Sequence, residues 1–218
     1  QERIPQRLSS LPSGYLNEQV EKFRNRSLAD TVYPVLWVDA LYEKVRVDGR
    51  IVSMAILIVC GVDENGHRDI ITVEPMAEES KSSYGVLFQN LKDHGLFTPK
   101  LIISDAHSGL VSAIRESFPS ASWQRCKVHF MRNILVYVPQ KEKKAFAETL
   151  KEIWLVPTAE FARKQAYDVI DSYAKRFPNE SSYVRLVTTY LMEYAEDWSV
   201  SRAYLSQKSI AATLLVAA

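Results

Sequence analysis

The sequence predicts an α/β domain with a mixed sheet, followed by a mostly helical region. Three runs rich in β-branched and aromatic residues follow one another at residues 35–47, 51–62 and 68–74. Two stretches with helical spacing then alternate with two further short apolar runs, as strands and crossover helices do. Beyond residue 130 the character changes, because the chain contains no glycine there and its apolar residues recur at helical spacing.

Short turns separate the first three runs. Asp48-Gly49 lies between the first and second runs, and Asn65-Gly66 lies between the second and third. Glycine after Asp or Asn is the usual signal of a tight hairpin, because these residues tolerate positive φ. We therefore predict an antiparallel meander of three strands.

Alternating helices and strands follow the meander. Residues 80–94 place apolar side chains on one helical face, and Gly95 stands where a C-terminal cap would. Residues 99–105 have the length and composition of a strand, residues 108–118 are again helical, and residues 122–128 fit a last short strand. The predicted order is βββαβαβ.

The last region is predicted to form successive helices, with breaks at Pro139, Pro157 and Pro178. Its aromatic residues fall at helical spacing, which core packing explains without a surface for stacking bases. These aromatic residues include Trp154, Phe161, Tyr167, Tyr173 and Phe177.

We predict three parts along the chain. Residues 1–30 form a tail and a helical linker, in which residues 16–23 have the spacing of one short amphipathic helix. Residues 31–131 form the core, and residues 132–218 form a helical insertion with an irregular C-terminal tail.

Composition restricts the classes of function. Of the 218 residues 47% are hydrophobic, and the net charge of +1 gives no global basic signal, so any DNA-binding face must be local. Cys60 and Cys126 are too few for a disulfide framework, and no leader opens the sequence, which favours a reducing cytoplasm. The longest apolar stretch, residues 51–62, falls short of the roughly 20 residues of a membrane helix, so a membrane span is excluded.

The order βββαβαβ is that of a ribonuclease-H-like core with a mixed five-stranded sheet, in which the first and fourth strands are neighbours. Asp39 lies in the first predicted strand and Asp105 at the end of the fourth. Two carboxylates at those positions would bind a divalent metal such as Mg²⁺ together. The alternative is that both are satisfied by backbone N–H groups, with Asp105 capping the following helix. Asp39 fits that alternative less well, because its apolar neighbours predict a buried carboxylate that needs a partner.

Cys126 and His129 form a Cys-x-x-His pair, which is half of a possible zinc site. A structural zinc ion needs four protein ligands, and none of the other Cys and His residues makes a second close pair. A structural or DNA-positioning role beside the aspartates is the preferred interpretation, and a buried cysteine with a capped histidine is its rival. His107 follows Asp105 by two residues, so it is either a contact for phosphate or the metal's outer shell, or an exposed loop residue.

A basic stretch follows the last predicted strand. Arg125, Lys127 and Arg132 are candidates for contacts with DNA phosphates. A solvated helix face with mixed charges explains the same residues equally well.

Several motifs occur in an order that resembles one known family. They are Trp37-Val38-Asp39-Ala40 with Lys44-Val45-Arg46, the stretch from Ile103 to Leu110, and above all the stretch from Trp123 to His129 with Arg132-Asn133. Over residues 17–178 the sequence resembles the Mutator family of bacterial insertion-sequence transposases.

This resemblance implies a DDE-type transposase, in which two Asp and a later Glu bind Mg²⁺ or Mn²⁺. Such an enzyme cleaves the ends of its own element and joins them to target DNA. Asp39 and Asp105 match the two aspartates, and Cys126 and His129 match the family's Cys-x-x-His motif. The implied partners are terminal inverted repeats, target DNA and further copies of the chain, and the implied location is the bacterial nucleoid in the cytoplasm.

The sequence departs from the family where the third carboxylate is expected, on a helix that packs back against the sheet. No segment like Thr-Asn-x-x-Glu-Arg occurs between residues 178 and 218, and Glu193 and Glu196 are weak substitutes because solvent exposure explains their pattern. Residues 204–218 can be back-translated into DNA and read in a frame shifted by two nucleotides. Some of the permitted codons then encode a segment that resembles the one preceding the missing glutamate in the family. A frameshift would explain both the bland tail and the absent residue.

The upstream helical DNA-binding region of the family is also not seen before residue 17. We therefore expect a central piece of a transposase with an incomplete triad. One alternative is a catalytically inactive remnant that binds DNA or a full-length transposase. Another is a ribonuclease-H-like nuclease of a different family, whose further carboxylate would be Asp63 or Glu74.

Overall fold

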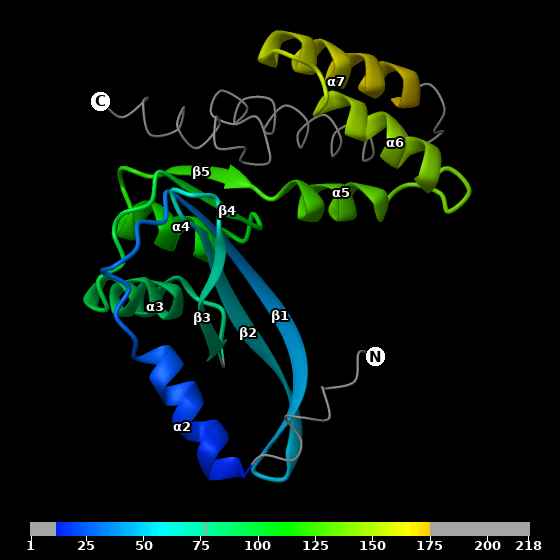
Figure 1. Ribbon diagram of the computed structural model, residues 1–218. Helices are drawn as coiled ribbons and strands as arrows, with labels where there is room; N and C mark the ends of the chain where they lie inside the picture. The colour runs from blue at the N-terminus through cyan, green and yellow to red at the C-terminus, as the bar shows by residue number, and fades with distance from the viewer. Residues whose placement is uncertain (1–11, 77, 175–218) are drawn as a thin grey trace.

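The computed structural model describes residues 12–76 and 78–174, and Figure 1 shows their arrangement. Five strands form one sheet in the order β3-β2-β1-β4-β5. The strands are β1 (Val35–Val47), β2 (Arg50–Val62), β3 (Arg68–Met76), β4 (Leu101–Ser104) and β5 (Ser122–Arg125). The helices are α2 (Ser13–Arg24), α3 (Lys81–Asp93), α4 (Ser108–Ser117), α5 (Lys127–Leu135), α6 (Lys143–Ile153) and α7 (Ala159–Ala174).

The predicted meander is confirmed, and its first turn explains the register. Asp48 and Gly49 both have positive φ, at 48° and 78°, which is the backbone of a type I′ turn. This turn closes β1 on β2 with Val47 opposite Arg50. β3 then pairs antiparallel with β2 after a turn that contains Gly66 at φ 88°.

The remaining strands run parallel to β1, which completes the predicted ribonuclease-H-like order. β4 pairs with β1 and β5 pairs with β4, both in parallel. The crossovers from β3 to β4 and from β4 to β5 contain α3 and α4, as parallel strands require. The last strand is shorter than predicted: β5 ends at Arg125 rather than at residue 128, and the backbone turns there into α5.

One face of the sheet carries the main core. Leu36, Leu57 and Ile102 are fully buried there and pack with Phe88 of α3 and Ile114 of α4. On the opposite face, side chains of the outer strand β3 are exposed, as at Ile70 (51%) and Val73 (37%), whereas Val35 at the start of β1 is fully buried. Figure 1 shows α3 and α4 together on the first face.

Both ends of α3 are fixed by local interactions. Ser80 and Ser83 form a capping box at the first turn. Gly95 follows the C-terminal cap with φ at 95°, which confirms its predicted role. A Cβ atom at this position would lie 2.8 Å from the Ala29 side chain and 3.0 Å from its backbone nitrogen. The loop before β1 therefore packs directly on the glycine.

Gly95→Ala is expected to lower the free energy of unfolding by about 1–3 kcal/mol, because alanine is strained at this φ and collides with Ala29. Gly85→Ala is the matched control. Gly85 lies inside α3 with no atom within 4 Å of a Cβ, so this change is expected to stabilise by about 0.5–1 kcal/mol. Urea unfolding of both variants measures the difference, and equal midpoints would contradict the tight contact.

The three helices after β5 form a second apolar cluster. Its fully buried members include Phe130, Ile134, Phe146 and Leu150, and Trp154 packs edge-on against Phe130 with ring centroids 6.0 Å apart. The core-packing interpretation was wrong for two aromatic residues, Phe161 (57% exposed) and Tyr167 (52% exposed), which lie on the outer side of α7. The side chain of Tyr173, Phe177 and the predicted break at Pro178 lie outside the described residues.

Two apolar clusters agree with the idea of a core and a helical region, but the boundary at residue 131 stays a prediction. None of the helices described here is long and apolar enough to cross a membrane. The predicted amphipathic helix before β1 is α2, which begins at Ser13, earlier than expected.

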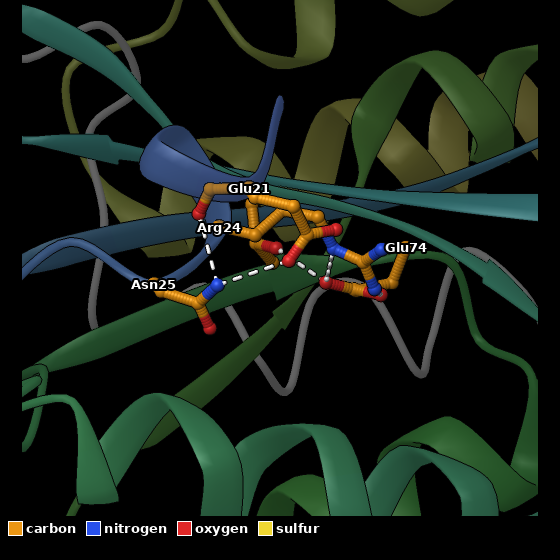
Figure 2. Close-up of polar contacts among 5 residues, drawn as sticks. Glu21, Arg24, Asn25 and Glu74 are labelled. Atoms are coloured by element: carbon orange, nitrogen blue, oxygen red, sulfur yellow. Dashed lines mark hydrogen bonds and ion pairs between the residues drawn. The ribbon is translucent and has the colours of Figure 1, made fainter. Parts of the chain in front are cut away.

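An ion pair joins α2 to the outer strand of the sheet. The Arg24 Nε donates to Glu74 Oε1 at 3.0 Å, and its Nη2 contacts the second carboxylate oxygen (Figure 2). Thr72 Oγ1 also donates to Glu74, at 3.2 Å. Arg26 Nη2 donates to the Ile70 carbonyl at 2.7 Å, which occupies an acceptor on the free edge of β3. Glu74 is therefore part of a structural contact between α2 and β3.

Candidate active site

The two predicted aspartates lie at the same level of neighbouring strands. The parallel pairing of β1 and β4 runs from Val35 opposite Leu101 to Val38 opposite Ser104. Asp39 is the next residue of β1, and Asp105 directly follows the end of β4, at the point where the parallel ladder ends. Neighbouring strands are about 4.8 Å apart, so this register places the two backbone positions side by side.

Asp39 is not the buried carboxylate that its apolar neighbours predicted. It is the fifth residue of the 13-residue strand β1, and its side chain is 51% exposed. Successive side chains of a strand point to opposite faces, and Asp39 lies on the face that α3 and α4 do not cover. A solvent-accessible carboxylate on an open sheet face can receive a metal ion or a substrate without first being uncovered.

His129 lies against Asp39. Its Nε2 is 3.4 Å from Asp39 Oδ1, and only 15% of the histidine side chain is exposed. Its Nδ1 is buried and has no hydrogen-bond partner among the described residues. Because β5 ends at Arg125, His129 stands in the first turn of α5, and this turn directs the ring toward β1. The histidine of the Cys-x-x-His pair therefore contacts the first aspartate.

The same motif also holds the backbone before the second aspartate. Trp123 Nε1 donates to Ser104 Oγ at 2.9 Å, and the Cys126 backbone N–H donates to the Ser104 carbonyl at 2.7 Å. Ser104 is 1% exposed, and its hydroxyl donates in turn to the Asp105 carbonyl at 2.8 Å. The stretch from Trp123 to His129 thus touches both aspartates, one directly and one through Ser104.

Asp105 does not cap α4, contrary to the alternative interpretation. Its Oδ1 accepts the N–H of Ala106 at 2.7 Å, whereas the N-cap is His107, whose Nδ1 accepts from Leu110 at 3.4 Å. The His107 ring also packs edge-on against Tyr84, with ring centroids 5.9 Å apart. These contacts give His107 a structural role at the start of α4, although its side chain stays exposed.

Tyr84 is a neighbour of the site that the sequence did not indicate. Burial raises the pKa of its hydroxyl well above the ordinary value, and a hydrogen bond to Glu79 together with the charges of Glu79 and Asp105 raises it further. The hydroxyl therefore stays protonated and is a fixed donor near Asp105. Its apolar position in α3 predicted only core packing, so no local signal distinguished it.

The three basic candidates differ in exposure. Arg125 was wrongly predicted to contact DNA at the surface: it is 3% exposed, and its guanidinium lies 5.7 Å from the centre of the Phe130 ring. Its burial removes the guanidinium from contact with phosphate. Lys127 is half-buried and Arg132 is exposed, so both stay candidates for DNA contacts.

No third carboxylate joins the aspartates within the described residues, where no group of three metal-binding side chains occurs. Glu74 is held by Arg24 on the outer strand. Asp63 lies in the turn before β3; desolvation works to raise its pKa, but hydrogen bonds from His67 and Asn65 outweigh this and lower it. The alternative nuclease that would use either residue is thus contradicted, and the same part of the chain holds no zinc site. Glu193 and Glu196 lie outside the described residues.

Comparison with known proteins places these features in one family. A sequence profile described as "Transposase, Mutator family" matches residues 5–196. The transposase for insertion sequence element IS256 in transposon Tn4001 of Staphylococcus aureus is 42% identical over 158 residues, which are 72% of this chain and 40% of that protein. The transposase for IS1081 of Mycobacterium tuberculosis is 34% identical over 185 residues, or 85% of this chain and 45% of that protein.

Among solved structures, the Drosophila P element transposase strand transfer complex covers 84% of this chain and 58% of that chain. The sequence identity is 10% and the TM-score is 0.36, so the fold assignment rests on the strand order instead. The chain spans less than half the length of the two insertion-sequence transposases. The match over residues 5–196 and the identity to both relatives show that the chain belongs to the Mutator family of transposases.

Proposed function

We propose that this chain contributes Asp39 and Asp105 to a transposase active site that cleaves and joins DNA strands with Mg²⁺ or Mn²⁺. The carrying observation is that Asp39 and Asp105 directly follow Val38 and Ser104, the last paired residues of β1 and β4, which brings their backbones to the same level. Carboxylate oxygens are ligands that Mg²⁺ prefers, and the exposed Asp39 leaves room for a metal and a phosphate. A metal bound there would lower the pKa of an attacking water or 3′-hydroxyl and stabilise charge on the phosphate.

The surrounding residues would hold the two carboxylates in place. His129 contacts Asp39 Oδ1 and restricts its rotation. Trp123 and Cys126 fix Ser104, and through it the backbone that leads into Asp105. Rigid support of this kind matters because displacement of a catalytic group by about 1 Å lowers the rate of reaction roughly 10²-fold.

The substrates would be the terminal inverted repeats of an insertion sequence and its target DNA. Further copies of the chain would join the active complex, which would act at the nucleoid. Lys127 and Arg132 lie on α5, the helix whose His129 contacts Asp39, and would contact phosphate, while Cys126 and His129 would position the site.

A second candidate function is a catalytically inactive remnant that binds DNA or a full-length transposase. It is favoured by one observation, the lack of a third carboxylate beside Asp39 and Asp105 within residues 12–76 and 78–174. The third carboxylate of the family is expected on a helix that packs against the sheet. Among the described helices, α5 contacts Asp39 through His129, and α5 has no carboxylate.

Nicking of supercoiled plasmid DNA with Mn²⁺ separates the two functions. Asp39→Asn and Asp105→Asn are each expected to lower the nicking rate about 10²–10³-fold, as loss of a group that stabilises transition-state charge does. Glu43→Gln is the matched control, because Glu43 is an exposed carboxylate on the same strand. Nicking that survives both Asp substitutions would contradict the metal site. DNA binding without any nicking by the unchanged chain would identify the remnant.

A further inference from the structure

The hairpin of β1 and β2 projects beyond the sheet as a two-stranded ribbon. β4 pairs with β1 only as far as Val38, and β3 pairs with β2 only from Ala55 onward. Residues 43–54, here called the ribbon, therefore have no neighbouring strand on either side among the described residues, and Figure 1 shows them extending past the rest of the sheet. At about 3.4 Å per residue, the five pairs of the ribbon extend roughly 17 Å.

The two faces of the ribbon differ in character. Side chains alternate along a strand, so Lys44 and Arg46 share one face with Tyr42 at the ribbon's base. Their partners across the ribbon are Ser53 and Ile51. That face has no carboxylate, because Glu43 points to the other face and Asp48 stands in the turn. The opposite face is largely apolar.

The cations on this face are available for a partner. Lys44 and Arg46 are both exposed, and neither makes an ion pair with any described residue. Tyr42 is 62% exposed beside them. A chain with a net charge of +1 has no general excess of cations, so two unpaired cations and a phenol in one row form a local basic surface.

We propose that the row Tyr42, Lys44 and Arg46 contacts the phosphate backbone of duplex DNA. A two-stranded ribbon fits the major groove of B-DNA, and Lys, Arg and Tyr side chains are common donors to phosphate oxygens. A second copy of the chain is the less favoured partner, because lysine and arginine on free edge strands oppose the addition of another strand. The proposal rests on the proposed function in one respect, namely that DNA is the substrate.

The test measures binding of a random-sequence 30-base-pair duplex by the whole chain at several salt concentrations. Lys44→Gln with Arg46→Gln is expected to make the slope of log K against log salt less negative by about 1.8, since each lost phosphate contact removes about 0.9. At about 0.1 M salt that corresponds to roughly 60-fold weaker binding. Lys22→Gln with Lys81→Gln is the charge-matched control, because those lysines pair with Glu18 and Glu116 away from the ribbon.

The possible outcomes distinguish the proposals. A larger loss in the ribbon variant than in the control, with equal thermal midpoints, supports the contact. Equal slopes for the two variants, with the unchanged chain still binding DNA, overturn the ribbon contact and leave the proposed function intact. If the ribbon variant changes only how the mass measured by ultracentrifugation depends on concentration, the row contacts a second copy of the chain instead. No DNA binding by the unchanged chain would overturn both proposals.

Discussion

His129→Ala is expected to weaken Mn²⁺ binding at the aspartate pair about 10–100-fold, the usual effect of removing a side chain that orients a metal ligand. The physical reason is that the half-exposed side chain of Asp39 contacts His129 Nε2 at 3.4 Å, and this contact limits its rotation. Without the ring, the carboxylate gains rotamers that do not point toward Asp105. Calorimetric titration with Mn²⁺ measures the change, and Asp39→Asn defines the complete loss of the site.

A second histidine provides the matched control. His67 contacts Asp63 through its Nδ1 at 3.2 Å, in the turn between β2 and β3, and its side chain is 77% exposed. His67→Ala removes the same chemical group from the same kind of pair and is expected to leave Mn²⁺ affinity unchanged. If His129→Ala and His67→Ala bind Mn²⁺ equally well, the contact with Asp39 does not position a metal ligand.

The adjacency of Asp39 and Asp105 could be predicted because its determinants are local or topological. Asp48-Gly49 specifies the first hairpin through positive φ, and alternating apolar runs specify the strands. Once the order βββαβαβ is known, parallel pairing of the first and fourth strands follows from the fold. The family resemblance then assigned the pair to metal.

The exposure of Asp39 could not be predicted, because coverage of a sheet face depends on distant elements. Trp37 and Leu41 share its face and make the local sequence look buried, yet Leu41 is 48% exposed. The prediction that Arg125 lies at the surface was wrong for the reverse reason. Its basic neighbours indicated a surface, but its side chain is buried, and the guanidinium lies 5.7 Å from the centre of the Phe130 ring. In both cases tertiary packing determines how exposed the side chain is, and the periodicity of the sequence does not predict that packing.

The contacts of the Cys-x-x-His motif could be predicted only in part. Its spacing indicated a paired function but not the partner. In the structure Cys126 acts through its backbone N–H on Ser104, and only His129 acts through its side chain, on Asp39. A motif that spans a strand end and the first turn of a helix can therefore serve two strands at once, because its residues face different neighbours.

Phe88→Ala is expected to lower the free energy of unfolding of the core by about 3–5 kcal/mol, through lost burial and the cavity that remains. Phe88 is fully buried between α3 and the sheet and packs edge-on against Phe118, with ring centroids 5.4 Å apart. Phe97→Ala is the matched control, because Phe97 is 49% exposed and its loss is expected to change stability by less than about 1 kcal/mol. Urea unfolding followed by circular dichroism compares the two variants.

The same variant tests the predicted division of the chain at residue 131. The cluster around Phe88 and the cluster around Phe146 are separate sets of buried side chains. If each is a cooperative unit, Phe88→Ala should accelerate amide hydrogen exchange in α3, β4 and α4 and leave the amides of α6 and α7 protected. Faster exchange in α6 and α7 to the same degree would mean that the helical region unfolds with the sheet. The boundary would then separate two layers of one domain. The helical region, which joins the site through His129 of α5, would belong to the same cooperative unit as the sheet.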